Sequence, residues 1–94
     1  MFDIAVAPDG RIRLAGRLDA SKAEAARAVF QEIRGSTVVD FSELTYISSA
    51  GLSVLLMTQK RLMGAGERLT LVNLSRHIHE VFRYAGFDNL FEIR

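Results

Sequence analysis

The feature that most constrains the fold is a change of hydrophobic period along the chain. In residues 2–6 and 11–14, apolar side chains alternate with polar or small ones, which is the period of a strand with one buried face. Residues 7–10 read Ala-Pro-Asp-Gly, a turn sequence, because proline presets φ and glycine accepts a positive φ. The start of the chain therefore predicts a β-hairpin.

After the hairpin the pattern alternates between helical and strand periods. Ser21 and Glu24 have the spacing of a capping box for a first helix, and Gly35 is a suitable stop. The remaining predicted elements are a strand at 37–41, a loop at 42–48, a helix at 49–63, a strand at 68–73, a helix capped by Ser75 and ended by Gly86, and a strand at 90–93. The order β-β-α-β-α-β-α-β predicts an α/β fold with a mixed, mostly parallel five-stranded sheet and three main helices.

Size and composition exclude several classes of protein. The chain has 94 residues, which predicts one domain over residues 1–94. It has no cysteine, so disulfides and thiolate metal sites are excluded. The 12 basic and 11 acidic residues are interspersed, so we expect no nucleic-acid partner. Apolar runs are too short to span a bilayer and the start does not resemble a signal peptide, so we expect a cytoplasmic protein with no direct membrane insertion.

The most informative segment for function is residues 38–56, which reads strand, loop, serine pair, small residues and helix. Ser49 lies where this helix is predicted to begin. One interpretation is an N-cap, which stabilises a helix by about 1 kcal/mol. The other is a phosphorylation site, where a phosphate would meet free N–H groups and add about −1.5 to −2 charges. Spacing alone favours the cap, and the small Ala50 and Gly51 would admit a phosphate or a partner's backbone.

The same segment resembles a known family. It reads Asp40-Phe41-Ser42-x-Leu44-x-Tyr46-Ile47-Ser48-Ser49-Ala50-Gly51-Leu52, which is similar to the signature of STAS-domain anti-sigma factor antagonists. Further similar segments are Gly16-Arg17-Leu18-Asp19, residues 64–69 and residues 81–91. Together they extend the resemblance over essentially the whole chain.

The resemblance implies a partner-switching function. An unphosphorylated antagonist of this family binds an anti-sigma factor that is also a serine kinase of the histidine-kinase-like ATPase type, and so frees a sigma factor. The kinase phosphorylates a serine at the start of the second helix, and a metal-dependent serine/threonine phosphatase resets the protein. By its place in the motif, Ser49 is the implied acceptor. Ser48 is the second choice, because it stands where the best-known phosphorylatable members carry an acid.

The second helix predicts a contact surface beside these serines. One face carries residues at helical spacing that we expect in the core: Leu52, Leu55, Leu56, Leu62 and Met63. Val54 and Met57 are expected to point the other way, and methionine suits an adaptable contact. With the resemblance, the predicted partner-binding residues are Asp19, Ser48, Ala50, Gly51, Ser53, Val54, Met57 and Arg61.

Two alternative functions remain open at this point. The first is a non-phosphorylated STAS subunit of a lipid-transport or other signalling assembly. The second is a small hydrolase or transferase in which Ser49 acts with Asp19 and Asp40, both expected near the carboxyl ends of adjacent strands. Ser49 lacks the flanking glycines of a nucleophile elbow, and His77 and His79 would face different sides of a helix. We therefore expect a non-enzymatic monomer or weak dimer with no cofactor and no metal.

Overall fold

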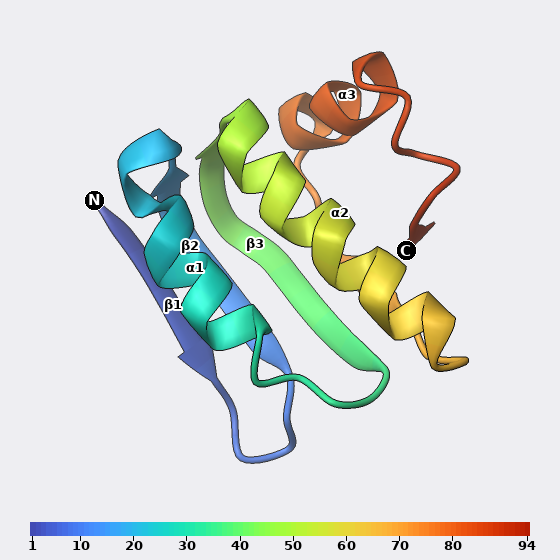
Figure 1. The fold of residues 1–94 in the computed structure, drawn as a ribbon. Helices are drawn as coiled ribbons and strands as arrows, with labels where there is room; N and C mark the ends of the chain where they lie inside the picture. Colours follow the sequence, from blue (N-terminus) through green and yellow to red (C-terminus); the bar gives the residue numbers. More distant parts are fainter.

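The computed structural model describes all residues from 1 to 94 and contains one five-stranded sheet, in the order β1-β2-β3-β4-β5. The strands are β1 (Phe2–Val6), β2 (Ile12–Leu18), β3 (Thr37–Ile47), β4 (Leu69–Val72) and β5 (Glu92–Ile93). The helices are a 3₁₀ turn η1 (Ala20–Lys22), α1 (Ala23–Phe30), α2 (Ser49–Gly64) and α3 (Arg76–Tyr84) (Figure 1). Only β1 and β2 pair antiparallel, so the predicted mixed, mostly parallel sheet and its element order are confirmed.

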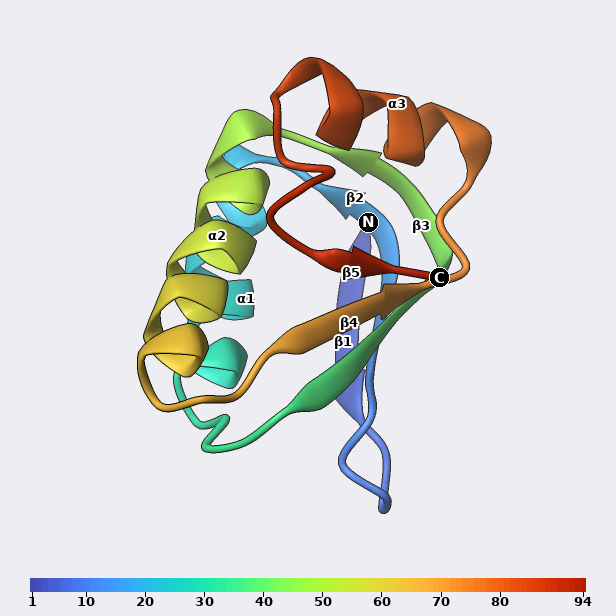
Figure 2. The ribbon, with the colours of Figure 1, turned by 90° about the vertical axis from the view of Figure 1, so that its right-hand side faces the viewer.

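The core lies between the sheet and the helices. Helices α1 and α2 cover one face of the sheet, and α3 lies apart from them near the curved half of β3 (Figure 2). The α3 residue Phe82 is fully buried and meets Phe41 and Phe91 edge to face, with ring centroids 5.9 and 5.6 Å apart. This aromatic cluster fixes α3 to β3 and to the segment that leads into β5.

Two strands are longer than the sequence predicted. The segment 42–47 was expected as a loop, but it continues β3, and β2 continues to Leu18, which pairs with Ile47. The pairing shifts twice along these strands, so the alternation of apolar residues is interrupted and the strand period is hidden. Gly16 lies at one shift with φ +85°, and a Cβ there would lie 2.2 Å from the Met1 carbonyl oxygen.

The predicted start and end of the first helix were wrong. Instead of a capping box with Glu24, the carboxylate of Asp19 accepts hydrogen bonds from the Ser21 N–H and hydroxyl, at 3.0 and 2.6 Å. This cap forms η1, and α1 begins only at Ala23. Glu24 pairs with Arg27 in the following turn. Helix α1 ends at Phe30 rather than near Gly35, and the Arg61 guanidinium donates to the Phe30 and Ile33 carbonyls there.

No helix of the protein combines the length and the apolar character that crossing a membrane requires.

Candidate functional site

The candidate site lies where β2 and β3 end together. The Ser48 N–H donates to the Leu18 carbonyl at 2.9 Å, and Asp19 follows Leu18 directly. Asp19 is the N-cap of η1 and Ser48 is the N-cap of α2, so both helical segments start directly after adjacent parallel strands (Figure 1). The structure thus brings Asp19, Ser48 and Ser49 to the carboxyl edge of the sheet, where α/β folds commonly place binding sites.

The two serines have different roles. The Ser48 hydroxyl accepts a hydrogen bond from the Gly51 N–H at 3.2 Å, and Ser48 has the extended backbone of an N-cap residue. Spacing alone favoured Ser49 as this cap, and that interpretation was wrong by one residue. Ser49 is instead the first residue of α2, exposed and not engaged in the cap. Whether its hydroxyl is modified stays a prediction.

Gly51 and Val54 do not form the open surface that the sequence suggested. Gly51 is buried, and a Cβ there would lie 2.8 Å from Leu18 Cγ and 3.0 Å from Ile47 Cγ1. Its small size lets α2 approach the strand ends rather than admit a partner. Val54 is only 8% exposed and belongs to the core, so its expected outward direction was wrong. The cause is that α2 packs against both the sheet and α1, which widens its buried face.

Most of the other α2 residues are exposed or buried as predicted, and Met63 is an exception. Ser53 is exposed and Met57 is 65% exposed, as expected. Leu52, Leu55 and Leu62 are buried, as expected. Met63 was expected in the core but is 58% exposed, because it lies in the last turn of the helix, after the last buried residue.

A groove of about 770 Å³ runs between α1 and α2. Five of the predicted contact residues from α2 line it: Ala50, Ser53, Val54, Met57 and Arg61. The opposite wall comes from η1, α1 and the segment that follows α1, and it includes Ala23, Arg27 and Arg34. The sequence did not predict this second wall. The helical period showed which α1 residues face the core but not that α1 packs beside α2, which follows from the strand order.

Asp19 is a negatively charged part of this edge at neutral pH. The hydrogen bond from the Ser21 hydroxyl is the main cause that lowers the pKa of Asp19, and backbone N–H groups of Ser21 and Lys22 add to it. These effects outweigh desolvation, which acts in the opposite direction. Asp19 holds η1 in place, and its contact with a partner stays a prediction.

Asp40 does not join the site. Because β3 continues to Ile47, Asp40 lies in mid-strand opposite Arg13, not near the carboxyl end as expected. Its neighbour Val39 is buried, so Asp40 projects from the face of the sheet that the helices leave open. Burial alone would raise the pKa of Asp40, but hydrogen bonds from Ser42 and Asn73 lower it overall. Asp40 therefore stabilises the sheet and does not converge with Ser49.

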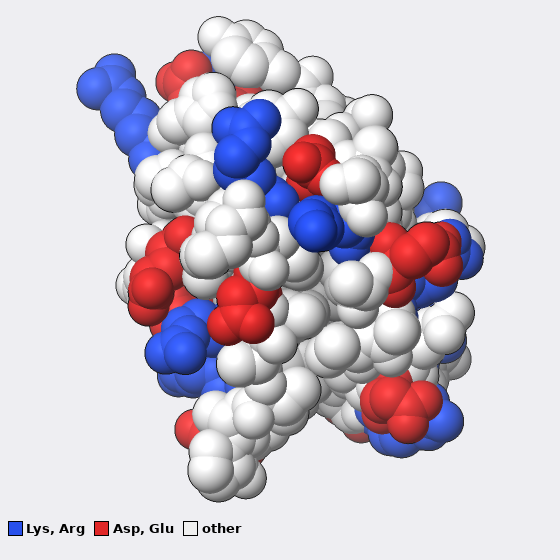
Figure 3. Space-filling model, turned by 90° about the vertical axis from the view of Figure 1, so that its left-hand side faces the viewer, with Lys and Arg blue, Asp and Glu red and all other residues white.

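Charges elsewhere form no site of their own. Acidic and basic side chains are interspersed over the face shown in Figure 3. His77 and His79 are both exposed on α3. No three His, Cys, Asp or Glu side chains are grouped closely enough to hold a metal ion.

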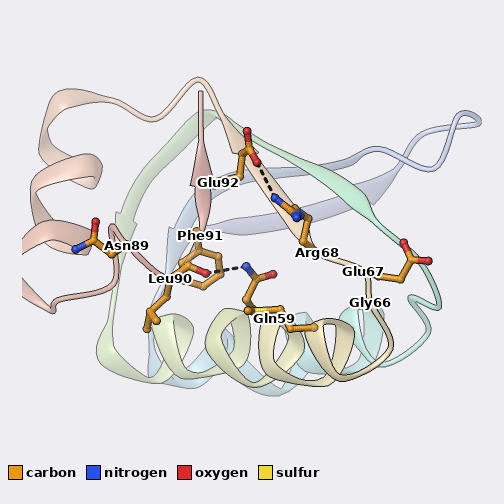
Figure 4. Close-up of a pocket in the computed structure, with 9 residues that line it drawn as sticks. Gln59, Gly66, Glu67, Arg68, Asn89, Leu90, Phe91 and Glu92 are labelled. Carbon is orange, nitrogen blue, oxygen red and sulfur yellow. Dashed lines mark hydrogen bonds and ion pairs between the residues drawn. The ribbon is translucent and has the colours of Figure 1, made fainter.

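A second, smaller pocket of about 370 Å³ lies near the C-terminal end of α2 (Figure 4). Gln59 is 4% exposed; its Nε2 donates to the Leu90 carbonyl at 2.7 Å, and its Oε1 accepts from the Leu69 N–H at 2.8 Å. Arg68 and Glu92 form an ion pair at 3.1 Å beside it. The Gln59 amide thus joins β4 to the chain just before β5. These polar groups have partners within the protein, so we regard this pocket as structural.

Comparison with known families identifies a match over most of the chain. Residues 4–92 match the family described as "Mlab, STAS domain". Among curated proteins, the "Putative anti-sigma factor antagonist BtrV" of Bordetella bronchiseptica is 43% identical over 56 residues, which are 60% of this chain and 48% of that protein. The match thus spans about half of that relative's length. The anti-sigma-B factor antagonist of Listeria monocytogenes is 31% identical over 87 residues, which are 88% of this chain and 76% of that protein.

Solved structures show the same fold. The anti-sigma factor antagonist SpoIIAA in its unphosphorylated form aligns with a TM-score of 0.76 at 22% identity, over 100% of this chain and 88% of that one. The phosphorylated form of SpoIIAA, from Bacillus, aligns with a TM-score of 0.70 at 21% identity, over 100% of this chain and 91% of that one.

Proposed function

The chain belongs to the STAS domain family, and from this membership we propose that it acts as an anti-sigma factor antagonist controlled by phosphorylation of Ser49. The unphosphorylated protein binds an anti-sigma factor, which releases a sigma factor. The partner is itself a serine kinase with a histidine-kinase-like ATPase domain, and a metal-dependent serine/threonine phosphatase restores the antagonist. The names of the two curated relatives support this proposal.

The observation that carries the proposal is the division of roles between Ser48 and Ser49. A kinase needs an accessible hydroxyl, and Ser49 offers one at the first position of α2. The Ser48 hydroxyl is half-buried and engaged with the Gly51 N–H, so its phosphorylation requires that the cap be broken. The cap thus supports Ser49 as the acceptor, although the family's usual acid is absent before it.

Phosphorylation at Ser49 would change the electrostatics of the contact surface. A phosphoserine adds about −1.5 to −2 charges at neutral pH. The carboxylate of Asp19 at the same edge is already ionised, so the phosphate would add negative charge beside an existing one. A partner that tolerates one carboxylate there would be repelled after phosphorylation.

Binding, rather than catalysis, is the function we propose. The serine hydrolase alternative needs Asp40 near Ser49, but Asp40 lies in mid-strand on the open face of the sheet and is held by Ser42 and Asn73. The groove beside Ser49 is instead walled by residues suited to a protein contact.

A second candidate function rests on the family description, which names Mlab rather than an anti-sigma factor antagonist. In that case the protein is a constant STAS subunit of a lipid-transport or other signalling assembly, and it uses the same helix surface without phosphorylation.

The test is a binding measurement with purified anti-sigma factors of the host, made with wild type, Ser49→Asp and Ser49→Ala. We expect Ser49→Asp to weaken binding about tenfold or more, because a negative charge placed opposite a negative partner surface is repelled. Ser49→Ala should bind like wild type and resist release by ATP, whereas Ser48→Ala should still be released. Equal affinity of wild type and Ser49→Asp, or no binding by wild type, would contradict the proposal. Stable co-purification with a transport ATPase, together with unmodified serines, would favour the second candidate.

A further inference from the structure

The groove between α1 and α2 has an apolar interior because small side chains face each other across it. Ala20 and Ala23 come from the η1 and α1 side and Ala50 comes from α2, and these small side chains leave the space between the helices open. Met57 adds an exposed apolar side chain on the α2 side, and the buried Val54 lies at the base of the groove. The result is an open channel of about 770 Å³, within the range of roughly 300–1,000 Å³ typical of ligand pockets.

The charges along this groove are mainly positive. Its lining includes three arginines, Arg27, Arg34 and Arg61, against a single acid, Glu24, which is paired with Arg27. Neither Arg34 nor Arg61 forms a salt bridge. Their guanidinium groups donate to backbone carbonyls at the end of α1, at 2.9 Å in each case. A guanidinium has five N–H donors, so each arginine retains donors for a further acceptor.

We propose that this groove binds an acidic amphipathic helix of the partner protein, an inference that rests on the proposed function. The apolar side of such a helix would lie on Ala23, Ala50 and Met57, and its carboxylates would reach Arg34 and Arg61. A helix satisfies its own backbone hydrogen bonds, so it can lie in a groove between two helices, which offers no sheet edge for backbone pairing. The excess of arginine over acid selects an acidic rather than a basic occupant.

This occupant explains how one phosphate could release the partner. Ser53 lines the groove and lies one helical turn after Ser49, on the same side of α2. A phosphate on Ser49 would therefore stand at the end of the groove, with the same sign of charge as the occupant. The arginines attract the acidic helix along the groove, and the phosphate repels it at one end.

The test compares two arginine reversals in binding to the anti-sigma factor. Arg34→Glu places an acid on the groove, and Arg76→Glu makes the same change at an exposed position of α3. We expect Arg34→Glu to weaken binding about tenfold or more and Arg76→Glu to change it less than about twofold. Arg34→Lys keeps the charge and should retain most of the affinity. Circular dichroism of each variant checks that the helices remain folded.

A second measurement identifies the occupant. A photo-crosslinking residue replaces Met57, which is exposed on the groove, or Tyr84, which is exposed on α3. We expect the probe at position 57 to crosslink to a net-acidic helical segment of the partner and the probe at position 84 to give no such product. A basic, uncharged or extended crosslinked segment would overturn the inference.

The outcomes separate the two proposals. If wild type binds and Ser49→Asp weakens binding, but Arg34→Glu binds like wild type, the groove inference is wrong and the proposed function stands. If wild type binds no anti-sigma factor, the proposed function fails and the groove inference fails with it.

Discussion

Helix α2 borders two pockets of opposite character. At its N-terminal end, Ser49 is exposed beside the start of a groove whose arginines, Arg34 and Arg61, form no salt bridge. At the C-terminal end, Gln59 is buried and bonded at both atoms of its amide, to Leu69 and to Leu90. Both regions are hollowed and both mix polar with apolar residues.

A binding surface and a structural pocket differ in how their polar groups are paired. Polar groups that are already paired contribute to folding, and a ligand gains little by competing with them. Groups that keep unused donors or an accessible hydroxyl contribute little to folding and are available to a partner. Substitutions at Ser49 and along the groove should therefore change binding, and substitutions at Gln59 should change stability.

The largest effect is expected at the C-terminal end, from Gln59→Leu. This change removes both hydrogen bonds of the amide and leaves the buried Leu69 N–H without an acceptor. An unsatisfied buried donor costs about 1–3 kcal/mol, and water can reach the more exposed Leu90 carbonyl. We expect the free energy of unfolding, measured by urea titration, to fall by about this amount.

The matched control for Gln59→Leu is Lys60→Leu at the next, exposed position of α2. Its free energy of unfolding should change by less than about 0.5 kcal/mol. The folded fraction of Gln59→Leu should bind the anti-sigma factor like wild type. If Gln59→Leu lost binding without losing stability, the pocket at Gln59 would be a binding surface and not a structural pocket.

A smaller effect is expected at the N-terminal end, from Ser48→Ala. The Ser48 hydroxyl caps α2 through the Gly51 N–H, and loss of such a cap costs about 1 kcal/mol. Ser49→Ala removes a hydroxyl that takes no part in the cap, so its effect on stability should stay within about 0.5 kcal/mol. Thermal unfolding of both variants checks this order. Equal losses, or a larger loss for Ser49→Ala, would mean that the cap is assigned to the wrong serine.

The sequence predicted the element order and the sheet because these depend on local patterns. The turn at Gly10, the N-cap at Ser75 and the helix that begins at Ser49 are each encoded by neighbouring residues, and all three are confirmed. The second half of β3 was missed because the pairing of β2 with β3 is irregular. Such irregularities depend on contacts between distant segments, which a local period does not record.

The candidate site was predicted in part for the same reason. The motif gave Ser49 and the α2 contact residues, and five of these line one groove. Val54 was placed wrongly because its burial depends on α1, which the helical period of α2 cannot include. Arg34 carried no local signal at all. Its role depends on the packing of two helices that are separate in sequence.

Asp19, beside the start of α2, and Glu92, in the pocket near the end of α2, should both affect stability in acid. The pKa of Asp19 is lowered mainly by the Ser21 hydroxyl, and that of Glu92 mainly by Arg94 and Arg68. A lowered pKa in the folded state means that the unfolded chain binds protons more readily, so each carboxylate stabilises the fold above its ordinary pKa. This stabilisation is lost as the pH falls below the ordinary values of 3.8 and 4.5 and through the folded-state values.

We expect Asp19→Asn and Glu92→Gln each to flatten the dependence of unfolding free energy on pH between about pH 5 and pH 2. Only Asp19→Asn should also disturb η1, because Ser21 depends on that carboxylate, and weaken binding to the anti-sigma factor. If the stability of Asp19→Asn depends on pH in the same way as that of wild type, the hydrogen bonds at η1 do not stabilise the ionised Asp19 carboxylate.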